Sequence, residues 1–321
     1  MNKVTDFLLR SSRRIWRLFI GNQSYYTPSL KGQAANDFIA EKIRSVDKGL
    51  MISKFGTSEL NTILCFLYNN RKISLKYLKD YIYGHIELNK KICIQSLCVN
   101  AGFFPQDEKL IQQYTDLTLE DIKDIDILGS YQKDEKVFSN ALQNCTKIDL
   151  DGFYAPFMWN KPWTKELKEK KVLVIHPFID SIRYQYEHNR EKLFNDPNVL
   201  PEFKELITLR AVQSIGGNGN PNFKDWFEAL KYMQEQMDKQ DYDVAIIGCG
   251  AYGMPLAAHA KRRGKIAIHL AGWTQMLFGI YGKRWIQDKP QYSKFINQYW
   301  IRPSKKETPN SAKDVEGGCY W

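Results

Sequence analysis

The sequence lacks three features that are typical of membrane or secreted proteins. It contains no run of about 18 apolar residues, so we expect no segment to cross a bilayer. Its first residues have neither the continuous apolar core nor the small-residue cleavage site of a secretory signal. Its six cysteines form no C-x-x-C pair and have no histidines at zinc-ligand spacing. Together these absences predict a cytoplasmic protein with free thiols.

Internal repeats and low-complexity segments are also absent, and the composition is that of an ordinary globular protein. The 321 residues, 43% hydrophobic and 26% charged, suffice for one large or two ordinary domains. The formal net charge of +10 suits a polyanionic partner such as a nucleotide diphosphate or an anionic lipid surface. A solvated basic surface explains the same excess of charge. We expect no nucleic-acid partner.

A glycine-rich turn lies between a predicted strand, residues 244–247, and a predicted helix. The turn consists of Gly248, Cys249, Gly250, Ala251, Tyr252 and Gly253. In this G-x-G-x-x-G context the first glycine permits a tight turn, the second lets a ligand approach the backbone, and the third lets the helix pack on the strand. The helix start offers N–H groups and a positive dipole end to a phosphate. The pattern indicates a phosphate-binding loop, with a simple packing turn as the alternative.

Strands and helices alternate through the second half of the sequence. Predicted strands lie near 172–177, 206–212, 244–247 and 265–270, and predicted helices near 181–194 and 223–238. This alternation predicts parallel β-α-β units in a Rossmann-like parallel sheet flanked by helices. The first half is helix-rich, with one short strand near 50–55 and helical periodicity through most of 71–147. We therefore expect an N-terminal helix and linker (1–30), an N-terminal α/β half (31–164), and a nucleotide-binding half with the C-terminal tail (165–321).

Residues 4–20 predict a basic amphipathic helix. At about 100° per residue the arginines fall in one arc and the apolar side chains in another. The two sets are Arg10, Arg13, Arg14 and Arg17, and Phe7, Leu8, Ile15, Leu18 and Phe19. Such a helix can lie on an anionic membrane surface, or its apolar face can dock on the body of the protein.

A second candidate site joins a strand end, a glycine turn and a helix start between Lys54 and Glu59. After Gly56, Thr57 or Ser58 can cap the helix, and Glu59 can complement the helix dipole in the first turn. This capping role explains Glu59 without any catalysis. The functional alternative makes Glu59 a general base, or a metal ligand through its hard oxygen atoms.

A third candidate site follows the last predicted strand, where Lys283 and Arg284 could place cations on a diphosphate. An exposed basic turn is the alternative. His176 and His269 both stand at predicted strand ends, where open α/β sheets bind ligands. In an NAD-binding fold an acidic residue would also stand near His269, but the sequence continues through Leu and Ala to Gly272. This departure disfavours a dinucleotide cofactor.

The segment from Lys54 to Glu59 resembles the Arg-Phe-Gly-Asp-Gly-Glu segment of bacterial GT-D-type glycosyltransferases. The stretches 243–285 and 315–321 resemble proteins of capsule and O-antigen gene regions that are grouped with the GT-D fold. The resemblance implies an α/β enzyme that takes a sugar from a nucleotide-sugar donor. In that family an Asp-x-Glu motif serves donor and metal binding. Here Thr57 replaces the aspartate while Glu59 remains, which leaves use of Mn or Mg open.

These features predict a cytoplasmic glycosyltransferase of bacterial surface-polysaccharide biosynthesis, held near the inner face of the membrane through residues 4–20. Its partners would be a nucleotide-sugar donor and a glycan or lipid-linked acceptor, with no certain cofactor. Glu59 would be the catalytic residue. The expected substrate-binding residues are Lys54, Gly56, Thr57, Ser58, His176, Gly248, Gly250, Ala251, Tyr252, Gly253, His269, Gly272, Lys283 and Arg284. The alternatives are an NAD(P)-dependent oxidoreductase acting on a sugar, and a non-catalytic protein that binds a nucleotide or glycan.

Overall fold

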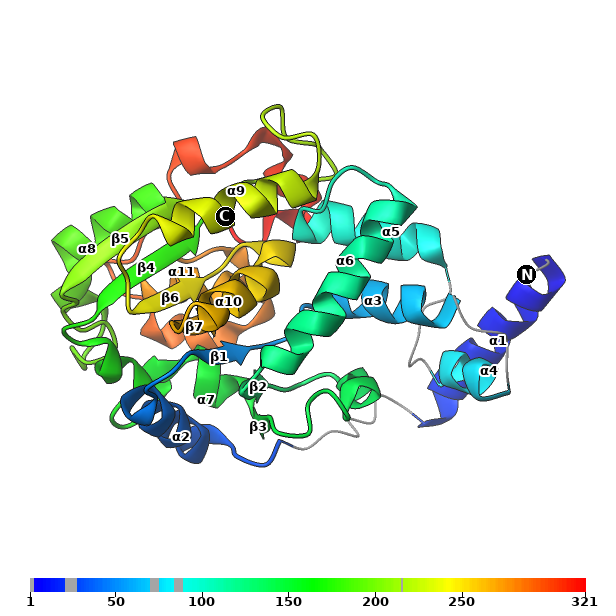
Figure 1. Cartoon of the computed structure of the whole chain (residues 1–321), viewed down its shortest axis with the longest axis horizontal. Coiled ribbons are helices and arrows are strands. Elements are labelled where there is room, and N and C mark those ends of the chain that lie inside the picture. Colours follow the sequence, from blue (N-terminus) through cyan, green and yellow to red (C-terminus); the bar gives the residue numbers. More distant parts are fainter. Residues whose placement is uncertain (1–2, 21–27, 70–74, 84–88, 215) are drawn as a thin grey trace.

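The protein is built on one seven-stranded parallel sheet with helices on both faces (Figure 1), which confirms the predicted α/β class. The computed structural model describes residues 3–20, 28–69, 75–83, 89–214 and 216–321. The strand order is β3-β2-β1-β7-β6-β4-β5. The strands are β1 (Leu50–Ser53), β2 (Ile127–Gly129), β3 (Thr146–Ile148), β4 (Lys171–His176), β5 (Glu205–Arg210), β6 (Val244–Ile247) and β7 (Ile266–His269).

The central strands consist of apolar residues because both faces of the sheet are covered. Every residue of β1, β6 and β7 is buried. Parallel sheets are buried in this way because their crossover helices pack on both sides. Alternate residues supply two separate cores: Leu173 and Ala245 belong to one, and Val174 and Ile246 to the other.

The helices divide between these two cores. One face of the sheet carries α3 (Thr57–Asn69), α5 (Lys90–Ala101), α6 (Glu108–Asp121), α9 (Trp226–Asp238) and α10 (Gly253–Arg262). The other carries α2 (Gly32–Ser45), α7 (Leu150–Tyr154), α8 (Ile179–Leu193) and α11 (Thr274–Leu277). Two further helices, α1 (Lys3–Ile20) and α4 (Leu75–Ile82), pack on one another at one end of the molecule (Figure 1). None of the helices within the described ranges has the length and apolarity needed to cross a bilayer.

The two predicted halves share the sheet. Strands β1 to β3 come from residues 31–164 and β4 to β7 from 165–321, and the pairing of Met51 with Ala267 joins them. The pattern between 71 and 147 did not reveal β2 and β3, which have three residues each. Of the predicted N-terminal linker, residues 21–27 lie outside the described part of the chain.

The connections after β4 and β6 leave the sheet in opposite directions. The helix that follows β4, α8, packs on one face, and the helix that follows β6, α10, packs on the other. These two strands are neighbours in the sheet. Diverging connections open a crevice at the carboxyl ends of the strands, which is where doubly wound sheets bind their ligands.

Candidate functional site

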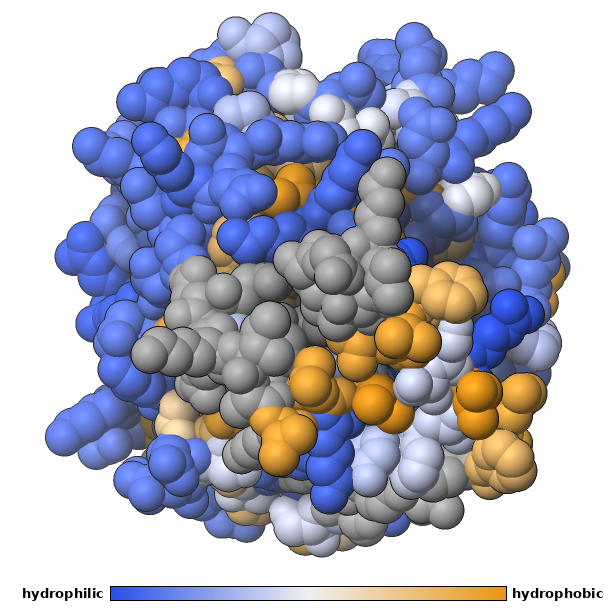
Figure 2. Space-filling model, turned by 90° about the vertical axis from the view of Figure 1, so that its right-hand side faces the viewer, coloured by the Kyte–Doolittle hydropathy of each residue, from blue (hydrophilic) through white to orange (hydrophobic). Residues whose placement is uncertain are grey.

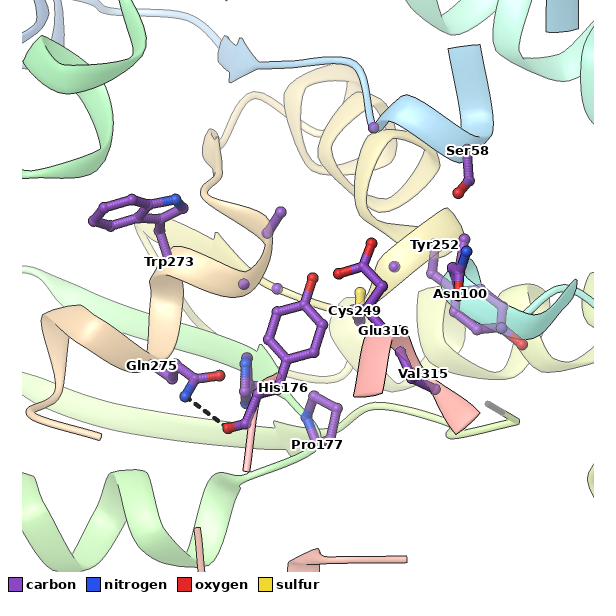
Figure 3. Close-up of a pocket in the computed structure, with 18 of the residues that line it drawn as sticks. Ser58, Asn100, His176, Pro177, Cys249, Tyr252, Trp273, Gln275, Val315 and Glu316 are labelled. Carbon is purple, nitrogen blue, oxygen red and sulfur yellow. Dashed lines mark hydrogen bonds between the residues drawn. The ribbon is translucent and has the colours of Figure 1, made fainter. Parts of the chain in front are cut away.

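A cavity of about 370 Å³ lies at this crevice (Figure 3). Its size is within the range of small-molecule binding sites. Four strand ends contribute to its wall, those of β1, β4, β6 and β7. The lining segments also include the end of α5, residues after β5, and the C-terminal residues. Of the substrate-binding residues expected from the sequence, the lining includes Lys54, Gly56, Thr57, Ser58, His176, Gly248, Gly250, Tyr252, Gly272 and Arg284, together with Glu59.

Glu59 lies in the first turn of α3 and borders the cavity. The turn begins at Gly56, whose carbonyl accepts a hydrogen bond from the Leu60 N–H at 2.9 Å. The Glu59 carboxylate folds back over Gly56, so that a Cβ added there would lie 2.0 Å from Oε2. A larger residue at position 56 would therefore force the Glu59 carboxylate to move away from the turn. The carboxylate therefore complements the helix dipole and also borders the cavity.

The neighbours of Glu59 are held by hydrogen bonds to other elements. Ser58 Oγ lies 2.8 Å from Ser96 Oγ of α5, and Thr57 Oγ1 lies 3.2 Å from the Tyr131 hydroxyl. That hydroxyl donates to the Phe55 carbonyl at 2.9 Å. The segment between β1 and α3 is thus fixed by α5 on one side and by the loop after β2 on the other.

The two predicted strand-end histidines have different surroundings. His176 lines the cavity, and its Nδ1 accepts a hydrogen bond from the Phe178 N–H at 3.0 Å. Burial lowers the pKa of His176 to about 3, so its ring is neutral and carries its proton on Nε2. His176 can therefore donate a hydrogen bond to a ligand without contributing a charge.

His269 does not line the cavity, contrary to the role expected from the sequence. Its Nδ1 lies 3.0 Å from Ser53 Oγ, which links the ends of β7 and β1. Its ring also fills the space beside Gly253, where an added Cβ would lie 2.1 Å from Nε2. Burial, together with the charge of Lys54, lowers the pKa of His269 to about 3. This histidine is a neutral packing residue between two strands and a helix.

The glycine turn after β6 borders the cavity but is shaped by packing within the protein. A Cβ on Gly248 would lie 2.4 Å from the Ala271 carbonyl oxygen. Gly250 has a φ of +57°, and a Cβ there would lie 2.5 Å from the Ala101 carbonyl oxygen. The space beside the second glycine therefore belongs to the end of α5 and not to a ligand. Gly253 packs on the His269 ring at the end of β7, and neither it nor Ala251 lines the cavity.

The predicted cation pair Lys283 and Arg284 is split by the structure. Arg284 lines the cavity, whereas Lys283 is exposed and lies outside it. The Arg284 guanidinium lies 4.4 Å from the centre of the Tyr320 ring, donates to the Tyr320 hydroxyl at 2.9 Å, and pairs with Glu316. These contacts fix the direction of its remaining donors.

Two further cations border the same cavity. Lys54 is half-buried at the end of β1, and Lys289, which sequence reasoning missed, lies 6.0 Å from the centre of the Trp273 ring. Burial raises the pKa of Tyr154, another lining residue, while the nearby Lys54 charge acts in the opposite direction. The cavity therefore combines three cations with aromatic walls.

The C-terminal residues form a wall that the sequence alone did not place at the site. The Tyr320 ring packs against Gly272, where an added Cβ would lie 2.4 Å from Cε1 of the ring. Gln275 Nε2 donates to the Tyr320 carbonyl at 3.1 Å, the dashed line in Figure 3. Trp321 Nε1 donates to the Glu307 carbonyl at 3.0 Å. Other lining residues missed by sequence reasoning are Asn100, Gly102, Tyr131, Tyr154, Gln213, Ser214 and Trp273.

The side chains of the lining do not by themselves form a divalent-metal site. Within the described ranges, no group of three or more His, Cys, Asp or Glu side chains could hold a metal ion. Two carboxylates, Glu59 and Glu316, border the cavity, and Glu316 is paired with Arg284. A divalent ion in this lining would therefore have Glu59 as its principal carboxylate ligand and would take its other oxygen donors from substrate phosphates and water, as Mg²⁺ commonly does.

Comparison with known proteins gives no relative from which a role could be transferred. The chain matches no protein-family model, no curated protein and no solved structure. Its function must be argued from the site.

Proposed function

We propose that this protein is a glycosyltransferase that binds a nucleotide-sugar in the cavity and transfers the sugar to a hydroxyl group of a glycan or lipid-linked acceptor. One observation carries the proposal: the Glu59 carboxylate shares a cavity with three cations, Lys54, Arg284 and Lys289. The resemblance of the segment between Lys54 and Glu59 to GT-D-type enzymes supports the same activity, as does the resemblance of the C-terminal half to proteins of capsule and O-antigen gene regions.

The cations suit the diphosphate of the donor. Negative charge grows on the leaving nucleoside diphosphate as its bond to the sugar breaks, and fixed cations stabilise that charge without reorganising. Arg284 is the strongest candidate because Tyr320 and Glu316 already hold its guanidinium in place. A guanidinium held in this way presents its donors as a rigid fork, the geometry that matches phosphate oxygens.

Glu59 suits the role of general base. The acceptor oxygen bonds to the anomeric carbon, its proton passes to the carboxylate, and the electron pair of the broken bond leaves with the diphosphate. The carboxylate lies in the first turn of α3, at the positive end of the helix dipole. No ion pair occupies Glu59 within the part of the chain that the structure describes, so the carboxylate is available to a proton donor.

Measurements of donor binding and of transfer rate distinguish the roles of Glu59 and Glu316, the two glutamates that line the cavity. Thermal unfolding with a panel of nucleotide-sugars should identify the donor, since a ligand at 100 times its Kd stabilises a protein by about 2.7 kcal/mol. Glu59→Gln should keep this stabilisation and lose about 100- to 10,000-fold in transfer rate. Glu316→Gln, the matched control in the same cavity, should weaken donor binding by releasing Arg284. A folded Glu59→Gln protein with wild-type transfer would contradict the proposal, as would the absence of any stabilising nucleotide-sugar.

A further inference from the structure

The N-terminal helix α1 presents three different faces. Its inner face packs on the body of the protein: Leu9 is buried in the core, and the Trp16 ring stacks on Tyr83, next to the end of α4, at 4.4 Å. The Arg13 guanidinium lies beside this face, 4.9 Å from the centre of the Tyr81 ring. These contacts fix the rotation of the helix about its axis, and they leave most of its apolar side chains outside.

The outer face of α1 is apolar and exposed. Leu18 and Phe19 are 80% and 84% exposed. The full set, called here the outer apolar face, consists of Phe7, Leu8, Ile15, Leu18 and Phe19. At about 100° per residue its five α1 members span about 120° of the helix. Figure 2, which views this end of the molecule, shows hydrophobic side chains gathered over one part of the face.

A gathering of this kind differs from the scattered apolar residues found on most surfaces. Five of the twelve large hydrophobic side chains that are exposed in the described ranges belong to the outer apolar face. The others, among them Tyr184, Tyr232 and Ile286, lie on separate elements. Contiguous exposed apolar surface marks a site of association with a protein or a membrane.

Positive charge borders the outer apolar face, and this charge favours a membrane over a second copy of the protein as the partner. Arg10 and Arg14 are exposed and project beside Phe7 and Leu18. The helix carries five basic residues and one acidic residue, Asp6. A second copy seated on this face would bring its own arginines against these, whereas lipid phosphates would neutralise them. An apolar stripe flanked by arginines is the pattern of helices that lie in the interface of anionic bilayers.

We propose that the outer apolar face docks on an anionic lipid bilayer, with the axis of α1 parallel to the membrane plane. The apolar side chains would enter the boundary between head groups and acyl chains, and Arg10 and Arg14 would contact lipid phosphates. The docking surface lies on α1, outside the cavity, so the proposal does not depend on whether sugar transfer occurs there.

Flotation of the full-length protein with vesicles tests the proposal. Vesicles of phosphatidylcholine with phosphatidylglycerol should carry the protein, and vesicles of phosphatidylcholine alone should carry much less. Replacing Phe7, Leu18 and Phe19 together by serine should reduce binding by at least a hundredfold, because each loses its burial in the bilayer. Arg10→Gln and Arg14→Gln should each reduce it roughly fivefold, and added salt should do the same.

A matched control replaces Tyr184, Tyr232 and Ile286 by serine, which removes three exposed hydrophobic side chains elsewhere. This variant should bind vesicles like the wild type. Thermal unfolding checks that every variant folds, and the single substitution Phe19→Ser serves where the triple variant does not. Equal binding by all variants, or no binding to anionic vesicles, would overturn the proposal. So would sedimentation that shows a wild-type dimer and a monomeric triple-serine variant without vesicle binding, since the face would then join two copies.

Discussion

Acid should weaken the fold through His269, the histidine that links β7 to β1. Its side chain is 3% exposed, and its Nδ1 has Ser53 as hydrogen-bond partner. Burial, and then the charge of Lys54, lowers its pKa from 6.5 to about 3. At pH 5 the ring is therefore neutral in the folded protein, while the unfolded chain binds a proton at the same residue.

The sign and size of the effect follow from proton linkage. The folded pKa lies below the unfolded one, so the unfolded state gains protons first as the pH falls. The stabilisation from neutral His269 is present above about pH 6.5 and is lost progressively toward pH 3. Between pH 7.5 and pH 5.0 the loss amounts to about 2 kcal/mol, because pH 5.0 lies about 1.5 units below the unfolded pKa and each unit corresponds to 1.36 kcal/mol.

Urea unfolding at the two pH values, in wild type and in His269→Asn, measures this loss. Other groups titrate in the same range: burial raises the pKa of Asp121 to about 7, which acts in the opposite direction. The comparison between the two proteins cancels such contributions. The pH dependence of His269→Asn should be about 2 kcal/mol smaller, and that of His188→Asn, an exposed control, should equal that of the wild type. Identical pH dependence in wild type and a folded His269→Asn protein would refute the reasoning.

Three further substitutions have defined outcomes. Gly253→Ala should lower the free energy of unfolding by about 1–3 kcal/mol, because the new Cβ meets the His269 ring at 2.1 Å. Gly219→Ala is the control, because the nearest neighbour of its Cβ lies at 4.0 Å. Equal effects of the two substitutions in urea unfolding would contradict the packing argument. Arg284→Lys should weaken nucleoside-diphosphate binding by about 10- to 100-fold in calorimetry, while Lys283→Gln, outside the cavity, should leave the affinity unchanged. A larger loss of affinity in Lys283→Gln than in Arg284→Lys would contradict the placement of the diphosphate in the cavity. Asn36→Ala should lower the free energy of unfolding by about 1–3 kcal/mol, because the buried side-chain amide donates to the Lys161 carbonyl at 3.0 Å and accepts from the Trp163 N–H at 2.8 Å. An unchanged midpoint of urea unfolding would refute this.

The sequence was most informative where strands are long and apolar. Strands β4 and β6 were predictable because runs of buried aliphatic residues stand between polar segments and turn residues. The three-residue strands β2 and β3 were not, because three residues carry no period that separates a strand from a helix. Their identity depends on pairing with β1, a long-range contact that local patterns do not contain.

The site was predictable in part for the same reason. Glu59 and Arg284 were named from their local context, and both border the cavity. Which side chains face inward is decided by packing, so neighbouring positions separated: Lys283 points to solvent while Arg284 is held by the C-terminal residues. Tyr320 reaches the cavity only because the chain returns to Gly272 after β7. No spacing in the sequence encodes that return.

The pairing of β1 with β7 has a consequence for how the chain folds. When the first half of the protein has been synthesised, β1 still lacks one neighbour, because Met51 pairs with Ala267. Glu59 follows β1 and Arg284 lies in the segment after β7, so the cavity can close only after nearly the whole chain is present. Contacts of such long range form slowly, and an unpaired strand edge attracts other chains in the meantime. Truncated or slowly translated chains should therefore aggregate through the open edge of β1, and coexpression with chaperones should raise the yield of folded protein.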